Sequence, residues 1–247
     1  MGPACRRLFV GLLLACAQGA AAEEALYRLL WPEGLAFMFT QAPGGRITSH
    51  ISVENLHAVD ISMPEGTRVL AARDGVVEAT EARHAANPED DPASEYGNFV
   101  RVRHADGTVA LYAHLRHAGV TVQPGERVAA GALLGISGAS GDTLVAQLHF
   151  GVARIERRDG REDPVSIPFR FYVGNPAIVF APRAGFTAVA RYSGPAQPPY
   201  SALDGRVAPW QVPTLAPGDE PLAWLALGAW LALGIAGCWW FWRFSRS

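Results

Sequence analysis

Three polar residues, Asp60, His114 and His149, lie inside apolar segments whose alternation is typical of β-strands. A carboxylate or an imidazole in the interior of a strand is costly unless it is paired or binds an ion. Gln147 lies two residues before His149, so both side chains point to one face of a strand while their apolar neighbours point into a core. Imidazole and carboxylate groups are ligands of zinc. The sequence therefore predicts a single site, and zinc is the ion that we expect there.

The segments that carry these residues belong to an expected all-β domain with a mainly antiparallel sheet. From residue 25 to about 155, short apolar alternations are broken by Gly, Pro and Asp, and no helix of ordinary length is evident. The candidate strands are 68–72, 75–79, 99–104, 109–114, 127–128 and 148–153. Further strand-like sequence continues from 155 to 182, so the domain is predicted to span 23–182.

Length and composition favour one well-buried domain with additional segments at both ends. The chain has 247 residues, of which 49% are hydrophobic and 18% charged. Its formal net charge of -2 argues against a nucleic-acid partner. Cys5, Cys16 and Cys238 all lie in the terminal segments, so the domain does not rely on disulfides even if it is exported.

Residues 1–22 are typical of an export signal. Two arginines precede an apolar segment that is too short to cross a bilayer, and small residues precede the acidic pair at 23–24. Ordinary cleavage after Ala22 is favoured. A lipoprotein signal acylated at Cys16 and a twin-arginine signal at 6–7 are the alternatives.

The C-terminal part is predicted to be a linker followed by a membrane anchor. Residues 183–220 are rich in proline and are interpreted as a linker. Residues 221–242 contain no charged residue and would measure about 33 Å as a helix, enough to span a bilayer. The arginines in 243–247 favour a cytoplasmic tail, which places the β domain on the periplasmic side of the inner membrane. A buried apolar hairpin is the alternative.

Seven short motifs follow one another in order along the β domain. They are 57–67, 71–77, 96–104, 112–115, 124–128, 135–138 and 148–150. In this order they resemble the lysostaphin-type (LytM-like) zinc metallopeptidases, which cut peptide bridges in bacterial cell walls. The resemblance covers residues 45–155 and implies a zinc-dependent peptidoglycan hydrolase.

The resemblance also implies a ligand set. In that family a His and an Asp of the first motif and the second His of a His-x-His pair hold zinc, and Asp60 and His149 match them. The first His is less direct, because the usual position four residues before the Asp is Leu56 here. His50 resembles a displaced ligand found in one branch of the family and is favoured. The alternative, His57, lies at an odd offset from Asp60 and would point to the opposite face of a strand.

The resemblance assigns catalytic positions to His114 and Gln147. In the family the first His of the pair acts as the base, and the histidine of the Tyr-Ala-His motif helps to stabilise the oxyanion. Here Gln147 occupies the base position. An amide cannot take a proton near neutral pH, and loss of a general base typically costs about 10²- to 10⁴-fold in rate.

Two functions from different classes follow from these residues. One is a membrane-anchored zinc metalloendopeptidase acting on peptidoglycan peptides. The other is a catalytically impaired module that binds peptidoglycan or activates a partner wall hydrolase. A carbohydrate-binding or biotinyl-like carrier domain is a third interpretation, but it leaves the predicted buried Asp and His residues unexplained.

Overall fold

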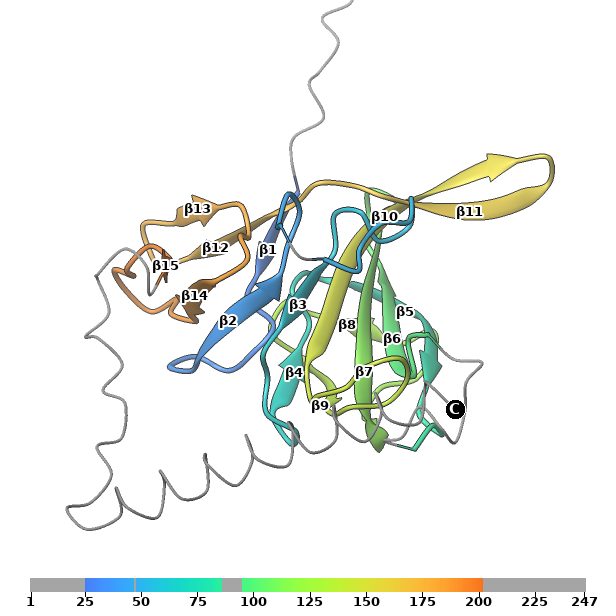
Figure 1. Ribbon diagram of the computed structural model, residues 1–247, viewed down its shortest axis with the longest axis horizontal. Coiled ribbons are helices and arrows are strands. Elements are labelled where there is room, and N and C mark those ends of the chain that lie inside the picture. The colour runs from blue at the N-terminus through green and yellow to red at the C-terminus, as the bar shows by residue number, and fades with distance from the viewer. Residues whose placement is uncertain (1–24, 47, 86–94, 202–247) are drawn as a thin grey trace, which may run out of the picture. The chain divides into compact units, whose positions relative to one another are not determined.

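The computed structural model describes residues 25–46, 48–85 and 95–201 (Figure 1). The predicted export signal at 1–22, the anchor at 221–242, the tail at 243–247 and the linker beyond residue 201 all lie outside these ranges. In the ranges that are described, no helix is long and apolar enough to cross a membrane.

The described residues form fifteen β-strands, which agrees with the expectation of an all-β domain. The strands are β1 (Leu26–Arg28), β2 (Ala36–Gln41), β3 (Val59–Ile61), β4 (Arg68–Leu70), β5 (Gly75–Glu81), β6 (Asn98–Arg103), β7 (Val109–Val120), β8 (Arg127–Val128), β9 (Leu133–Ser137), β10 (Leu148–Arg158), β11 (Arg161–Ser166), β12 (Arg170–Val173), β13 (Ile178–Phe180), β14 (Phe186–Val189) and β15 (Tyr200–Ser201). Each of the six candidate strands predicted from the sequence overlaps one of them.

A twelve-stranded sheet dominates the domain. Its main path runs β15-β14-β2-β3-β10-β7-β6-β5-β8, with β11 paired to β10 and β9 paired to β4 and β7. All of its pairings between the described strands are antiparallel, as predicted, whereas the smaller sheet β1-β12-β13 includes one parallel pair, β1 with β12. Figure 1 shows β11 leaving the sheet with the end of β10 as a long hairpin.

The core lies on one face of the large sheet and is shared with the small one. Phe150 on β10 contacts the rings of Tyr27 on β1 and Phe171 on β12, with centroids 5.9 Å apart in both pairs. All three side chains are buried. Because side chains alternate along a strand, the residues next to Phe150 on β10, His149 and Gly151, point to the other face, called here the outer face.

The domain extends beyond residue 182, so the predicted linker at 183–220 is wrong over its first part. Strand β14 pairs with β2, and β15 pairs with β14 at the end of the sheet. Ala188 and Ala190 are buried in the core. The segment 184–194 contains no proline, and the prolines at 195, 198 and 199 lie outside both strands. In the described part of the chain only the two-residue strand β15 follows these prolines, and it lies at the edge of the sheet, where neighbouring proline is tolerated.

Candidate metal centre

His50, Asp60 and His149 form a buried cluster on the outer face of the sheet. Asp60 on β3 and His149 on β10 are directly opposite each other in the antiparallel register. The Asp60 Oδ1 atom lies 2.9 Å from Nδ1 of His149 and 3.3 Å from Nε2 of His50. One candidate ligand atom from each residue lies within 4.8 Å of the other two. The structure thus brings together the three residues predicted as ligands.

His50 and His57, the two alternatives for the first ligand, have different surroundings. The His50 side chain is buried, and its Nδ1 lies 3.1 Å from the carbonyl oxygen of Ala58. A carbonyl oxygen only accepts, so Nδ1 can donate to Ala58 while Nε2 faces Oδ1 of Asp60. His57 is half-buried and lies outside the cluster, and its backbone N–H donates to the Ser166 hydroxyl.

Gln41 supports the cluster from β2 and was missed by the sequence reasoning. Its Nε2 donates to Oδ2 of Asp60 at 2.6 Å, and its Oε1 accepts from the backbone N–H of Ser49 at 2.6 Å. Gln41 therefore ties the carboxylate to the segment that carries His50. The only signal in the sequence is a polar pair, Thr40 and Gln41, at the end of an apolar segment.

The Asp60 carboxylate is held in its charged form. Burial alone would raise its pKa, but hydrogen bonds and favourable charge interactions from His149 and His50 outweigh burial and hold the pKa well below the usual range. The donor set is therefore one carboxylate and two imidazoles, which matches the ligand types of open zinc sites.

A β-bulge directs His114 into the same region. Between the pairs Val100–Tyr112 and Asn98–Leu115, β7 has two residues where β6 has one. His114 has a φ of 62°, a left-handed conformation that is uncommon for residues other than glycine. Its ring centroid lies 5.9 Å from that of His149. The bulge thus breaks the simple alternation expected along the strand and places His114 beside the cluster.

The imidazole of His114 is neutral, with its tautomer fixed by the backbone. Nδ1 lies 2.8 Å from the carbonyl oxygen of Ser140, so Nδ1 carries the proton. Burial, together with the nearby His149, lowers the pKa of His114 to about 4. Nε2 therefore carries a free lone pair near neutral pH.

One polar cleft of about 140 Å³ joins these residues. Its lining residues are Ser49, His50, Asn55, Asp60, Glu95, Tyr96, His114, Asp142, Gln147 and His149. Gln147, predicted to stand at the base position, thus lines the same cleft as His114. Sequence reasoning did not identify Tyr96, whose ring centroid is 5.7 Å from that of His149.

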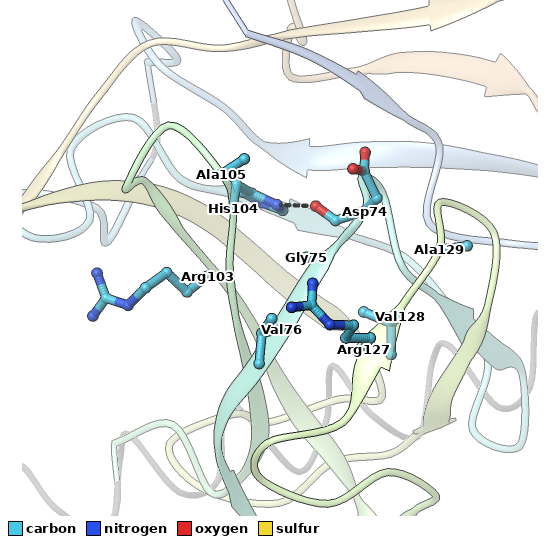
Figure 2. A pocket seen from close by; sticks show the side chains of 9 residues that line it. All are labelled: Asp74, Gly75, Val76, Arg103, His104, Ala105, Arg127, Val128 and Ala129. Atoms are coloured by element: carbon cyan, nitrogen blue, oxygen red, sulfur yellow. Dashed lines mark hydrogen bonds between the residues drawn. The ribbon is translucent and has the colours of Figure 1, made fainter.

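His104 does not belong to the cluster. It lies at a separate hollow of about 520 Å³ lined in part by Arg103 and Arg127 (Figure 2). Its buried imidazole is bonded through Nδ1 to the carbonyl oxygen of Asp74 at 2.8 Å, and its buried Nε2 has no hydrogen-bond partner among the residues that the structure describes. Burial lowers the pKa of His104, so folding favours the neutral form of its imidazole.

We expect His104 to make the domain sensitive to mild acid. Since its folded pKa lies below the unfolded value of about 6.5, the unfolded chain takes up the proton first as the pH falls. The contribution of neutral His104 to the free energy of unfolding is complete above about pH 6.5. It is lost as the pH falls from the unfolded pKa to the lower folded pKa. Replacing His104 with phenylalanine should reduce the fall in the free energy of unfolding from about pH 7 to pH 5, measured by urea denaturation. Identical slopes for both proteins would contradict this assignment.

Comparison with known proteins shows a family match within the domain. The model of peptidase family M23 matches residues 54–164, a range that holds Asp60, His114, Gln147 and His149, whereas His50 lies just before it. The cell division protein DipM of Caulobacter vibrioides is 39% identical over 92 residues, which are 37% of this chain and 13% of DipM. The DD-carboxypeptidase/endopeptidase Mpg of Neisseria meningitidis is 30% identical over 158 residues, covering 63% of this chain and 32% of Mpg. The chain thus spans a third or less of the length of these relatives.

Solved structures are also similar to this chain. Lysostaphin from Staphylococcus simulans is 23% identical, with 52% of this chain and 47% of that chain covered and a TM-score of 0.38. A catalytic-domain variant of the prophage-encoded M23 protein EnpA from Enterococcus faecalis is 22% identical, with 51% and 87% covered and a TM-score of 0.38. Residues 54–164 of this chain are thus similar to peptidase family M23, on the match to the family model.

Proposed function

We propose that this chain is a zinc metalloendopeptidase that cuts peptides of peptidoglycan and so acts as a cell-wall hydrolase. One observation carries the proposal: the His50–Asp60–His149 cluster and a neutral His114 line the same cleft. The names of two similar proteins, Mpg and the peptidoglycan DD-endopeptidase ShyC of Vibrio cholerae, support a peptidoglycan substrate.

The residues of the cluster fit a zinc ion through Nε2 of His50, a carboxylate oxygen of Asp60 and Nδ1 of His149. Ala58 fixes the tautomer of His50, and Gln41 holds the second oxygen of Asp60, as partners of metal ligands commonly do. Zinc bound by three such ligands would lower the pKa of a bound water and polarise the peptide carbonyl.

His114 is the residue that we assign as the proton acceptor. Its Nδ1 proton is already donated to Ser140, so Nε2 can accept a proton from the attacking water. This role differs from the oxyanion role that the family resemblance implies, because a neutral imidazole with this tautomer has no proton on Nε2 to donate. Gln147 is left to donate hydrogen bonds through its amide, which suits a carbonyl oxygen in the cleft.

The proposed place of action is the periplasmic face of the inner membrane. The support comes from the sequence alone, namely the export signal at 1–22 and the uncharged segment 221–242 followed by arginines. Two experiments on cells that express the full chain test this topology: cell fractionation, and protease added to intact spheroplasts. Digestion of the β domain in intact spheroplasts is the expected result, and its protection there would contradict the proposal.

The function is tested on the purified full chain with isolated sacculi. We expect close to one zinc per chain by elemental analysis and release of soluble peptide fragments that stops when a chelator removes the metal. Release should return when zinc is added back. A chain that binds zinc but releases no fragments would rule out the hydrolase.

Gln41 should influence metal affinity without touching the metal. Its replacement with leucine leaves Oδ2 of Asp60 and the N–H of Ser49 without their shared partner. We expect zinc affinity to fall about 10- to 100-fold, the usual cost of losing a partner of a metal ligand. Competition with a chromophoric chelator measures this. Gln123→Leu, the same change at an exposed position outside the cleft, is the control, and equal affinities for both variants would contradict the role given to Gln41.

Gln147 favours a second candidate, a catalytically impaired module that binds peptidoglycan or activates a partner hydrolase. The variant Gln147→His separates the two. If His114 already serves as the base, Gln147→His should change turnover by less than about tenfold. If the site lacks a base, the same variant should raise turnover by about 10²- to 10⁴-fold. Turnover of a synthetic peptide by the wild type and the variant, at equal zinc content, is the measurement.

A further inference from the structure

The backbone conformation of His114 depends on segments outside its own strand. A φ of 62° is uncommon for a residue other than glycine, and such a conformation persists only where the surroundings fix it. The backbone N–H of His114 donates to the carbonyl oxygen of Tyr96 at 3.0 Å, and the carbonyl oxygen of His114 accepts from the N–H of Gly138 at 3.1 Å. Tyr96 lies in the loop before β6 and Gly138 in the loop after β9. The residues that hold these two loops together therefore also hold His114.

Asn98, the first residue of β6, is fully buried and joins three separate segments. Its Nδ2 donates to the carbonyl oxygens of His84 at 2.8 Å and Leu115 at 3.0 Å, and its Oδ1 accepts from the N–H of His84 at 2.8 Å. Its backbone N–H donates to the hydroxyl of Ser140 at 2.9 Å. Because Leu115 follows His114 directly, the Asn98 side chain bonds to the bulge itself.

Ser140 holds His114 from two directions. Its carbonyl oxygen accepts from Nδ1 of the imidazole at 2.8 Å, and its hydroxyl donates to the carbonyl oxygen of Leu115 at 2.6 Å. The carbonyl oxygen of Leu115 thus accepts from Ser140 and from Asn98. These two hydrogen bonds fix the backbone that follows His114, while the Ser140 carbonyl fixes the ring.

Two glycines bring the Ser140 segment against the beginning of β6. Gly97 and Gly141 have φ angles of 56° and 79°, in the left-handed region. A Cβ atom on Gly97 would overlap the carbonyl carbon of Ser140, and one on Gly141 would overlap the backbone nitrogen of Gly97. The two backbones are therefore in direct contact, which keeps the Ser140 hydroxyl and the Asn98 amide within reach of one carbonyl oxygen.

We infer that Asn98 and the hydroxyl of Ser140 are positioning residues for His114 and act through the carbonyl oxygen of Leu115. Neither Asn98 nor Ser140 lines the cleft, so neither is placed to touch a bound substrate. Their hydrogen bonds keep the bulge in the conformation in which Nδ1 of His114 meets the Ser140 carbonyl and Nε2 keeps its lone pair. The inference rests on the proposed function, because it concerns the residue assigned there as the proton acceptor.

The variant Ser140→Ala tests the hydroxyl alone. It keeps the backbone carbonyl that meets the imidazole but removes the bond to Leu115 and the acceptor for the N–H of Asn98. We expect kcat for a synthetic peptide to fall about tenfold with KM unchanged, because misplacing a reacting group by about 1 Å costs up to about 10²-fold in rate. The full-length wild type and variant are compared at equal zinc content.

The variant Ser137→Ala is the matched control. The Ser137 side chain is as deeply buried, donates to the carbonyl oxygen of Pro64 at 2.6 Å and accepts from the N–H of Thr67 at 3.0 Å. The same number of hydrogen bonds is therefore lost, but to the turn between β3 and β4. Urea denaturation should show similar losses of stability in both variants, whereas only Ser140→Ala should lower kcat. Equal losses of kcat would overturn the inference and leave Ser140 a structural role only.

The variant Asn98→Asp tests the shared route through Leu115. Aspartate can still accept from the N–H of His84, but its carboxylate cannot donate to the Leu115 carbonyl. Combined with Ser140→Ala, it should lower kcat by less than the product of the two single losses, because both variants remove bonds to one acceptor. A combined loss equal to that product would contradict a shared route.

The tautomer of His114 gives a measurement that needs no catalysis. Nitrogen NMR of the metal-free full-length chain with labelled histidine reports it, and the signals of His114 are those missing from His114→Gln. Wild type and Ser137→Ala should show a protonated Nδ1 and an unprotonated Nε2, whereas in Ser140→Ala the two signals should shift toward each other as the tautomers mix.

The outcomes separate this inference from the proposed function. An unchanged tautomer in Ser140→Ala would overturn the inference even if the wild type cuts peptides. A tautomer that changes in Ser140→Ala but not in Ser137→Ala, in a chain whose wild type cuts no peptide, would uphold the positioning of His114 and reject the peptidase.

Discussion

Replacing Asp60 with alanine is expected to abolish zinc binding and, with it, release of peptide fragments from sacculi. Both imidazoles of the cluster meet at Oδ1 of this one carboxylate, at 2.9 and 3.3 Å. Losing a partner of a ligand already costs about 10- to 100-fold in affinity, so losing the ligand should cost more than about 100-fold. Zinc per chain after dialysis and the release of fragments are measured on the same preparation.

Asp142 provides the matched control. It lines the same cleft but lies outside the three-residue cluster, so Asp142→Ala should retain zinc. Circular dichroism of both variants checks that the β domain is folded. If Asp60→Ala is folded and keeps stoichiometric zinc, the cluster is not the metal centre.

Replacing His114 with glutamine is expected to lower kcat by about 10²- to 10⁴-fold while the zinc content stays unchanged. Nε2 of His114 carries the lone pair that we assign to proton transfer. Glutamine offers a polar group of similar length that takes no proton near neutral pH. Because His114 is not one of the three predicted ligands, metal binding should survive. Single-turnover hydrolysis of a synthetic peptide and elemental analysis measure the two effects separately.

His117 on the same strand is the control for this variant. Its side chain is exposed, and His117→Gln should leave kcat unchanged. An unchanged kcat in His114→Gln would move proton transfer away from His114 and favour a base supplied by another group. Loss of zinc in His114→Gln would instead show that His114 supports the metal centre.

Most of the fold and the cluster of candidate ligands could be predicted, because the strands and the polar residues within them follow a local pattern. Alternating apolar residues and turn residues mark β4 to β8 and β10, whereas β9 was not predicted. Asp60 and His149 are conspicuous as polar residues in apolar segments. The choice of His50 over His57 also agrees with the geometry, although a family pattern and not a physical signal favoured it.

Other features depend on pairing between distant segments and could not be predicted. Gln41 matters only because β2 lies beside β3, and nothing in the sequence around residue 41 reveals this neighbour. The bulge at His114 arises from the register between β6 and β7, whereas alternation within β7 alone predicts a regular strand. Strand β14 was assigned to a linker because the prolines that follow it dominate the composition there.

The three residues of the cluster come from a loop and two strands, and nearly 100 residues separate His50 from His149. No short piece of an unfolded chain can offer all three, so an ion that binds there recognises only the native state. Such selective binding adds a free energy that grows with the logarithm of the ion's concentration, about 4 kcal/mol at a thousandfold excess over the dissociation constant. The melting temperature of the chain would then report the free zinc around it, and scarcity of zinc would expose the β domain to proteolysis before any chemistry failed.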